Sequence, residues 1–302
     1  MLQDVLTKIG VDLDVSFNFI FLTLIWVRVL AMGVTIPFLL GKPVPRYVLV
    51  GATMVMAVFV HVNIVPDSPP PLELNLLALI VLYMKEVFYG LAIGFAVGIL
   101  FHGIESAGQM VDNQRGVSIA RILIPQLDSQ GSISGNFLFQ LALVLYLTVG
   151  GHLIFFNSFF TSFITLPILE FPTSGPGLFA LIDFFMKITG EVIVISIKLA
   201  APVIIAIFLA DIILGIANRV SPQIDVWMMG FTVKGYLGII MVFLSITIIC
   251  DQIIEYSQKA NNNADKAVLF LENKVPIPTI PMPAPEEGLP KPEMGPPQVV
   301  TP

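Results

Sequence analysis

The stretch Asn218-Arg219-Val220-Ser221-Pro222-Gln223-Ile224-Asp225 is a short polar segment between two long apolar runs. Upstream, residues 203–217 carry a single charge, Asp211, and downstream, residues 226–250 carry a single charge, Lys234. Proline lacks a backbone N–H and restricts the residue before it, so we expect the chain to reverse direction here. The pattern predicts a helical hairpin with a charged tip and two arms in an apolar medium.

The composition indicates a membrane protein. Hydrophobic residues make up 56% of the 302 residues and charged residues only 12%, and the mean hydropathy is +0.90. Soluble domains carry about 25% charged residues. The formal net charge of −6 gives no basic surface, so we expect no nucleic-acid partner. The one cysteine, Cys250, excludes an internal disulfide and offers no Cys-x-x-Cys redox or metal pair.

Apolar windows long enough to span a bilayer, about 20 residues, occur in six regions. These are residues 15–40, 47–65, 74–104, 136–169, 178–217 and 226–250. The fourth region has no charged residue but is too long for one simple span, so Gly150-Gly151-His152 near its middle predicts a bend or a hairpin tip. The sequence therefore predicts an all-α membrane protein with about six long apolar helical regions, several of them kinked hairpins.

The fifth region is unusual because four charged residues lie inside it, Asp183, Lys187, Glu191 and Lys198. Asp183 and Lys187, and then Lys187 and Glu191, are four residues apart, so on a helix they stack on one face as alternating ion pairs. Each charge costs about 3 kcal/mol at the centre of a bilayer. We therefore expect this helix to face protein or water.

A change in composition divides the chain into two parts. Residues 1–260 carry the apolar regions and are predicted to form one helical membrane domain. Residues 261–302 begin with three asparagines and then become proline-rich, with Pro276, Pro278, Pro281, Pro283 and Pro285 in close succession. Dense proline removes backbone donors and favours polyproline II or disorder. This tail is predicted to be disordered, and a docking segment for a partner is the alternative.

Enzyme motifs are absent from the sequence, which has no H-E-x-x-H, no G-x-S-x-G and no Walker A loop. His61, His102 and His152 lie in separate segments with no carboxylate at ligand spacing, so we expect packed or interfacial histidines rather than metal ligands. We expect no catalytic residue, no metal and no cofactor.

Two further patterns concern packing and a polar loop. Gly90, Gly94 and Gly98 recur every four positions, which predicts close approach of a neighbouring helix. Polar groups crowd into residues 108–118, and residues 121–134 are rich in Gly, Ser, Gln and Pro. Such a backbone cannot lie bare in lipid. We expect the loop to line an aqueous cavity or to be buried in protein, with an ordinary solvent loop as the alternative.

The order of these signals resembles the FliR/SctT family, a membrane component of type III secretion and flagellar export gates. The resemblance covers residues 15–255, and it is specific because of the order and spacing of the matching positions. Asp112-Asn113-Gln114-Arg115-Gly116 is more similar to the injectisome (SctT) branch than to the flagellar branch. The matching positions are Arg28, Pro37, Val44-Pro45-Arg46, Glu86, Gly90, Gly94, Gly108, Asp112, Gln114-Arg115-Gly116, Gly151-His152, Leu166-Pro167, Pro202, Asp211, Leu214-Gly215, Arg219, Pro222-Gln223, Gly230 and Lys234.

The resemblance implies a place in a helical hetero-oligomer in the bacterial inner membrane, part of it above the bilayer plane, whose pore passes unfolded secreted proteins. The implied partners are FliP/SctR-type and FliQ/SctS-type subunits, the FlhB/SctU-type switch protein, and membrane lipid. Kinked hairpins held within protein would also account for the charged fifth region.

By the same resemblance, residues 115–132 are similar to a loop that plugs the pore, and the segment around Arg219 and Pro222 corresponds to a cytoplasmic hairpin tip near the switch protein. The implied plug and gating residues are Asp112, Gln114, Arg115, Gly116 and Arg121. The implied hairpin-tip and partner-contact residues are Asp211, Arg219, Pro222, Gln223 and Lys234. We expect Arg115 to anchor the plug and closure to rest on loop packing and dewetting.

Two other functions remain open from the sequence. A secondary transporter for a small solute would use Asp211, Lys198 and Glu191 as coupling or substrate residues, although no repeat relates residues 15–135 to residues 136–255. An intramembrane enzyme is the third reading, and no catalytic pair at usable spacing supports it. An export subunit is expected to depend on sister subunits, whereas a transporter works as a monomer or homo-oligomer.

Overall fold

The computed structural model describes residues 15–39, 45–65, 76–117, 131–171, 176–221, 223 and 225–272, and all regular structure in these ranges is α-helical. The prediction of an all-α protein is confirmed. The helices are α2 (Val15–Thr35), α3 (Arg46–Ile64), α4 (Leu76–Gln114), α6 (Ile133–Thr148), α7 (Gly151–Thr165), α8 (Pro176–Val220), α9 (Val226–Leu244) and α10 (Ile246–Leu271).

Within the described ranges, α2, α3, α4 and α8 are each long and apolar enough to cross a membrane. The bent pairs α6–α7 and α9–α10 raise this number to six if each pair counts as one span. The six predicted apolar regions are therefore confirmed as helical, and the chain is a multi-pass membrane protein.

Two sharp bends divide the fourth and sixth apolar regions. α6 and α7 meet at 73°, where Gly150 has φ +79°, a left-handed conformation that other residues rarely adopt. This is the bend predicted at Gly150-Gly151-His152. α9 and α10 meet at 60° around Ser245. The second bend was not predicted because no glycine or proline marks it.

α10 continues well past the last apolar region and ends at Leu271. Its buried residues fall on one face, and two of them are asparagines, Asn261 and Asn263. Asn261 accepts a hydrogen bond of 2.7 Å from the Tyr146 hydroxyl on α6. The predicted division after residue 260 thus falls inside a helix. Residues 273–302 lie outside the described residues, and their disorder stays a prediction.

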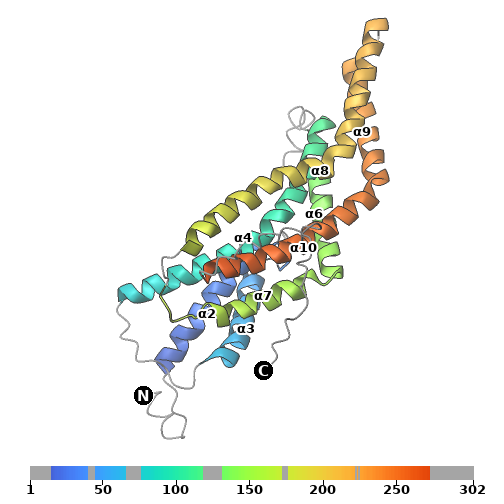
Figure 1. Ribbon diagram of the computed structural model, residues 1–302. Helices are drawn as coiled ribbons and strands as arrows, with labels where there is room; N and C mark the ends of the chain where they lie inside the picture. The colour runs from blue at the N-terminus through green and yellow to red at the C-terminus, as the bar shows by residue number, and fades with distance from the viewer. Residues whose placement is uncertain are drawn as a thin grey trace, which may run out of the picture.

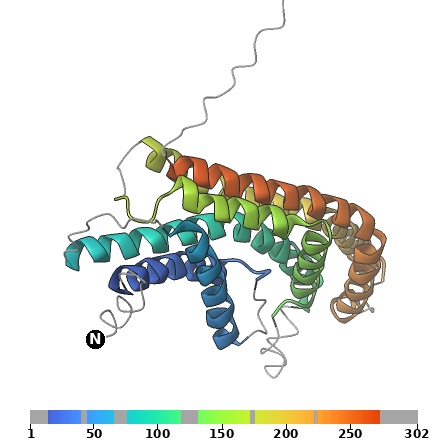
Figure 2. The same ribbon diagram turned by 90° about the horizontal axis from the view of Figure 1, so that it is seen from below.

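α4 lies at the centre of the fold and packs against α2, α6, α8 and α10. α3 packs on α2, and α10 lies alongside α7 and crosses α4 (Figure 2). The first part of α8 packs on α4 and α10, and its last part pairs with α9 and extends away from the other helices as a long arm (Figure 1). This arm is the hairpin predicted from residues 218–225.

Large apolar side chains remain exposed on α3, α8 and α9. Examples are Val55, Val62, Phe208, Ile213, Tyr236 and Phe243, each more than 60% exposed. An exposed apolar surface of this extent marks contact with lipid or with another protein. The isolated chain therefore leaves its outer faces without the neighbours that they require.

The charges of the fifth region are arranged differently from the prediction. Asp183 and Lys187 form an exposed ion pair of 2.6 Å at the beginning of α8. Glu191 pairs with Lys259 of α10 at 2.9 Å rather than with Lys187. The expected alternating ladder was wrong at this step because spacing within one helix does not reveal a cation on a neighbouring helix.

Candidate functional site

Asp112, near the end of α4, is a buried carboxylate that binds the beginning of α6. Its Oδ2 accepts hydrogen bonds from Ser132 Oγ at 2.7 Å and from the Ser134 backbone N–H at 3.0 Å. Its Oδ1 accepts from Ser134 Oγ at 2.5 Å and from Arg115 Nη1 at 3.4 Å. Asp112 is only 2% exposed, and protein donors satisfy both of its carboxylate oxygens, as a buried charged group requires.

These contacts form what we call the Asp112 clamp: Asp112 and Arg115 on one side, and Ser132 and Ser134 on the other. The clamp joins the two described ends of the chain around residues 118–130. That segment, with Arg121 in it, lies outside the described residues.

The turn after α4 is also fixed by α9. Gly116 has φ +83°, and a Cβ at this position would lie 2.7 Å from the Phe231 ring. Arg115 lies against Gly238, where a Cβ would come within 2.6 Å of the arginine side chain. Gln114 is exposed. The turn therefore requires glycine at position 116 for both its backbone conformation and its space.

α4 and α6 approach each other closely at a pair of glycines beside the clamp. A Cβ at Gly108 would lie closer than 3.0 Å to backbone atoms of Ser134 and Gly135. Ser132 caps α6 by accepting a 2.8 Å hydrogen bond from the Gly135 N–H. Because Ser132 also donates to Asp112, the same side chain starts α6 and attaches it to α4.

The glycine ridge of α4 faces α2. A Cβ at Gly98 would lie 2.6 Å from the Thr35 carbonyl oxygen, and one at Gly90 or Gly94 would overlap the α2 backbone or the Thr35 side chain. Larger residues at these positions would push the two helices apart.

The hairpin-tip candidates lie farther along the arm. Asp211 on α8 and Lys234 on α9 form an ion pair of 3.0 Å across the two helices. Arg219 and Gln223 are exposed, and Pro222 lies outside the described residues. Lys234 lies on α9 between Phe231 and Gly238, the two residues that contact the turn after α4. α9 therefore links the ion pair on the arm to the clamp.

A buried ionic network was not proposed as a site from the sequence, although the resemblance used two of its members. Arg28 on α2 and Glu86 on α4 form a bidentate pair, with Arg28 Nη2 3.1 Å from Oε1 and Nε bound to Oε2. Lys85 Nζ lies 3.0 Å from the same carboxylate. Arg28 and Glu86 are 0% exposed and Lys85 is 5% exposed.

Five backbone carbonyls complete this network, all from the end of α7 and the loop after it. Arg28 donates to Ser162 O at 3.1 Å and to Leu166 O at 2.9 Å. Lys85 donates to the carbonyls of residues 167, 168 and 170 at 2.8 to 2.9 Å. Two cations thus face one carboxylate, and the carbonyls at a helix C-terminus supply the remaining negative potential.

This network joins α2, α4 and the end of α7, segments that are far apart in the sequence. Sequence spacing could not reveal it, because Arg28 and Glu86 are 58 residues apart and no local motif links them. The only available signal was the presence of charge in otherwise apolar helices, which is costly unless it is paired.

The described residues hold no group of three or more His, Cys, Asp or Glu side chains arranged to bind a metal ion. Three groups of sequence-predicted residues are brought together: Asp112, Arg115 and Gly116 at the clamp, Asp211 and Lys234 as a pair on the arm, and the three glycines of the ridge against α2. The described residues Gln114, Arg219 and Gln223 are exposed. The arrangement positions helices relative to one another.

Comparison with known proteins identifies relatives over most of the chain. Residues 19–260 match the family described as bacterial export proteins, family 1. The Yop proteins translocation protein T of Yersinia pestis is 32% identical over 238 residues, covering 79% of this chain and 88% of that protein. The flagellar biosynthetic protein FliR of Bacillus subtilis is 30% identical over 227 residues, covering 75% and 86%. The surface presentation of antigens protein SpaR of Shigella flexneri is 25% identical over 177 residues, covering 59% and 65%.

Proposed function

The chain belongs to the bacterial export proteins, family 1, and from this membership we propose that it is a subunit of a type III secretion export gate in the bacterial inner membrane. It helps to form and gate a pore through which unfolded proteins pass. The match over residues 19–260 is the single observation that carries this proposal, because it includes the clamp, the buried network and the arm.

The exposed apolar faces of α8 and α9 support membership of a hetero-oligomer. Phe208, Tyr236 and Phe243 are each more than 60% exposed on the arm, where a second protein would cover them. The proposed partners are SctR/FliP-type and SctS/FliQ-type subunits. The tip around Arg219, Pro222 and Gln223 is proposed to contact the SctU/FlhB-type switch protein.

Residues 115–132 are proposed to plug the pore. The Asp112 clamp supports this role, because it fixes the described residues that flank the segment on both sides. A pore for an unfolded chain should have few strong side-chain preferences, and a segment rich in Gly, Ser and Gln meets that need. In this proposal the pore is closed by packing of the loop and by dewetting, and not by a charged filter.

The injectisome branch is preferred over the flagellar branch on the form of residues 112–116. The overall identities, 32% to the Yersinia protein and 30% to the Bacillus flagellar protein, differ too little to decide the branch. The relatives are named as a translocation protein, a flagellar biosynthetic protein and a surface presentation of antigens protein, and none of these names supports the solute-transporter alternative. The family role is that of a structural component of an export apparatus.

Co-purification tests the proposal directly. The full-length chain would be expressed in mild detergent conditions with and without the SctR-type and SctS-type proteins of the same source, and the products weighed by native mass spectrometry. We expect one large complex that contains a single copy of this chain. A stable monomer or homodimer that ignores both partners would refute the proposal and favour a transporter.

A further inference from the structure

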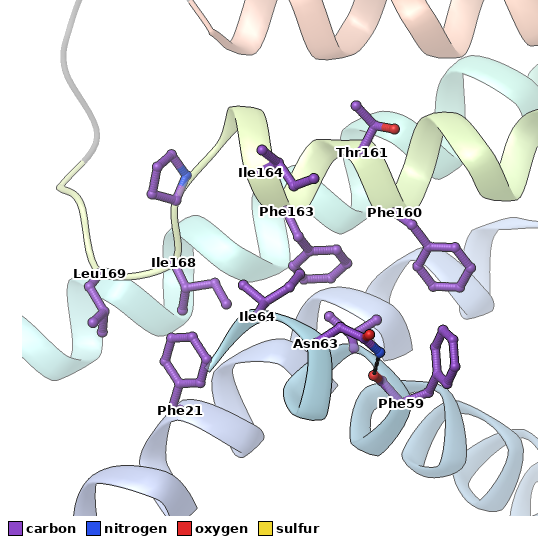
Figure 3. Close-up of a pocket in the computed structure, with 12 residues that line it drawn as sticks. Phe21, Phe59, Asn63, Ile64, Phe160, Thr161, Phe163, Ile164, Ile168 and Leu169 are labelled. Carbon is purple, nitrogen blue, oxygen red and sulfur yellow. Dashed lines mark hydrogen bonds between the residues drawn. The ribbon is translucent and has the colours of Figure 1, made fainter. Parts of the chain in front are cut away.

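An apolar cavity of about 610 Å³ lies between α2, α3 and the end of α7 (Figure 3). Its volume falls within the range of about 300–1,000 Å³ typical of ligand pockets. Four phenylalanines line it, Phe21 from α2, Phe59 from α3, and Phe160 and Phe163 from α7. The floor is closed by the loop after α7, where Ile168 is 3% exposed.

The side chains that line the cavity are mostly apolar. None of these residues is ionisable, and the only polar side chains are Asn63 and Thr161. Asn63 Nδ2 donates to the Phe59 carbonyl at 2.7 Å, and Thr161 Oγ1 donates to the Asn157 carbonyl at 2.8 Å. Both are used within their own helices, as Figure 3 shows for Asn63.

The buried ionic network keeps the floor of the cavity apolar as well. The carbonyls of Pro167 and Ile168, which line the cavity as residues, are bound by Lys85 Nζ. The Phe163 ring covers the Arg28 guanidinium, with Cζ 4.4 Å from the ring centre, and also lines the cavity. A charged solute or a lipid phosphate would find no ionisable side chain in the lining.

The mouth of the cavity is continuous with the apolar outer surface of α3. Phe59 at the rim is 64% exposed and Ile164 is 74% exposed, whereas Phe21 and Phe163 inside are below 5%. Only 17% of the hydrophobic window of α3 is buried, and Val55 and Val62 on this helix are also exposed. In a multi-pass membrane protein this surface meets hydrocarbon, so acyl chains lie directly at the mouth.

We propose that this cavity binds one acyl chain of a membrane phospholipid, with the headgroup remaining outside among the bulk lipids. A flexible hydrocarbon chain needs no hydrogen bond and fits a cavity lined mainly by aromatic and aliphatic side chains. The acyl chain would lie between α3 and α7, which contact each other only slightly in the described structure. The proposal does not depend on the export role.

Photolabelling of the full-length chain tests the site. The chain is reconstituted into vesicles of phosphatidylethanolamine and phosphatidylglycerol containing a phosphatidylcholine whose acyl chain carries a diazirine. After irradiation, adducts are mapped by mass spectrometry. We expect several-fold more labelling at Phe59, Phe160 and Ile164 than at Val55 and Val62. Equal labelling of both sets would overturn the proposal, because it would mean ordinary annular lipid.

A filling variant provides the second measurement. Thr161→Trp places an indole in the cavity, and we expect it to lower the adducts at Phe59 and Ile164 several-fold. Leu153→Trp is the matched control, because Leu153 is exposed on the same helix but does not line the cavity. Labelling that Thr161→Trp leaves unchanged contradicts the site. If cavity labelling is lost when sister subunits are co-expressed, the cavity is occupied by a protein partner and the lipid proposal is refuted. If Thr161→Trp does not fold, the pattern of labelled residues in the wild-type chain decides by itself.

Discussion

Replacing Asp112 by asparagine should loosen the clamp while preserving its shape. The amide keeps one oxygen, which can still accept from two donors, but its NH₂ group must take the place of the other. If it replaces Oδ2, it faces the Ser132 hydroxyl and the Ser134 N–H. The hydroxyl can turn and accept, whereas the backbone N–H cannot and is left unpaired.

The magnitude follows from these contacts. An unpaired buried donor costs about 1–3 kcal/mol, and each hydrogen bond to a charged acceptor contributes about 1.5–3 kcal/mol, part of which is lost with the charge. We therefore expect Asp112→Asn to reduce the free energy of unfolding by about 2–4 kcal/mol. Asp183→Asn is the matched control, because its carboxylate is 64% exposed and its ion pair contributes only about 0.3–0.5 kcal/mol.

Two assays apply to both variants. Thermal unfolding in detergent measures stability, and single-channel recording of the assembled complex in planar bilayers measures ion leak. We expect Asp112→Asn to unfold at a lower temperature and to leak, since the clamp flanks the proposed plug. An Asp112→Asn protein that unfolds and conducts like Asp183→Asn would refute the clamp as a determinant of either property.

Three more substitutions test separate parts of the structure, each measured by thermal unfolding in detergent. Gly116→Ala should lower the free energy of unfolding by at least about 1–2 kcal/mol, because of the positive φ alone, and should disturb closure. Gly190→Ala is the control: Gly190 has open space around it, so alanine should raise the free energy of unfolding by about 0.5–1 kcal/mol. Equal effects of the two substitutions would contradict this reasoning. Glu86→Gln leaves two buried cations uncompensated and should cost about 3–5 kcal/mol, and a loss below about 1 kcal/mol would show that the carbonyls suffice. Tyr146→Phe should cost about 1–3 kcal/mol by leaving the buried Asn261 oxygen unpaired, and no change would indicate that water replaces the hydroxyl.

The fold could largely be predicted because long apolar segments identify membrane helices in a sequence. The six regions, the hairpin around residues 218–225 and the bend at Gly150 all follow from hydropathy or from one glycine. The continuation of α10 to Leu271 could not be read this way. Asn261 and Asn263 look like the start of a polar tail, and only a neighbouring helix turns them into buried contacts.

The candidate site was predictable in its local part and not in its long-range part. The crowding of polar groups around Asp112 indicated a special turn, but the serines that bind it lie 20 and 22 residues away in sequence. A role for Lys85 was not predicted, because no residue near it in sequence indicates that its amino group binds three backbone carbonyls. Partners of this kind are set by the packing of distant helices.

The length of α8 has a consequence for how the helix can be placed in a bilayer. Its 45 residues span about 67 Å as a continuous helix, more than twice the roughly 30 Å thickness of the hydrocarbon layer. An upright α8 therefore cannot fit within one bilayer, and the ion pair at its beginning and Arg219 at its end must lie in different surroundings. Pro202 lies inside this helix and supplies no backbone N–H to its hydrogen-bond ladder, so we expect α8 to bend most easily there.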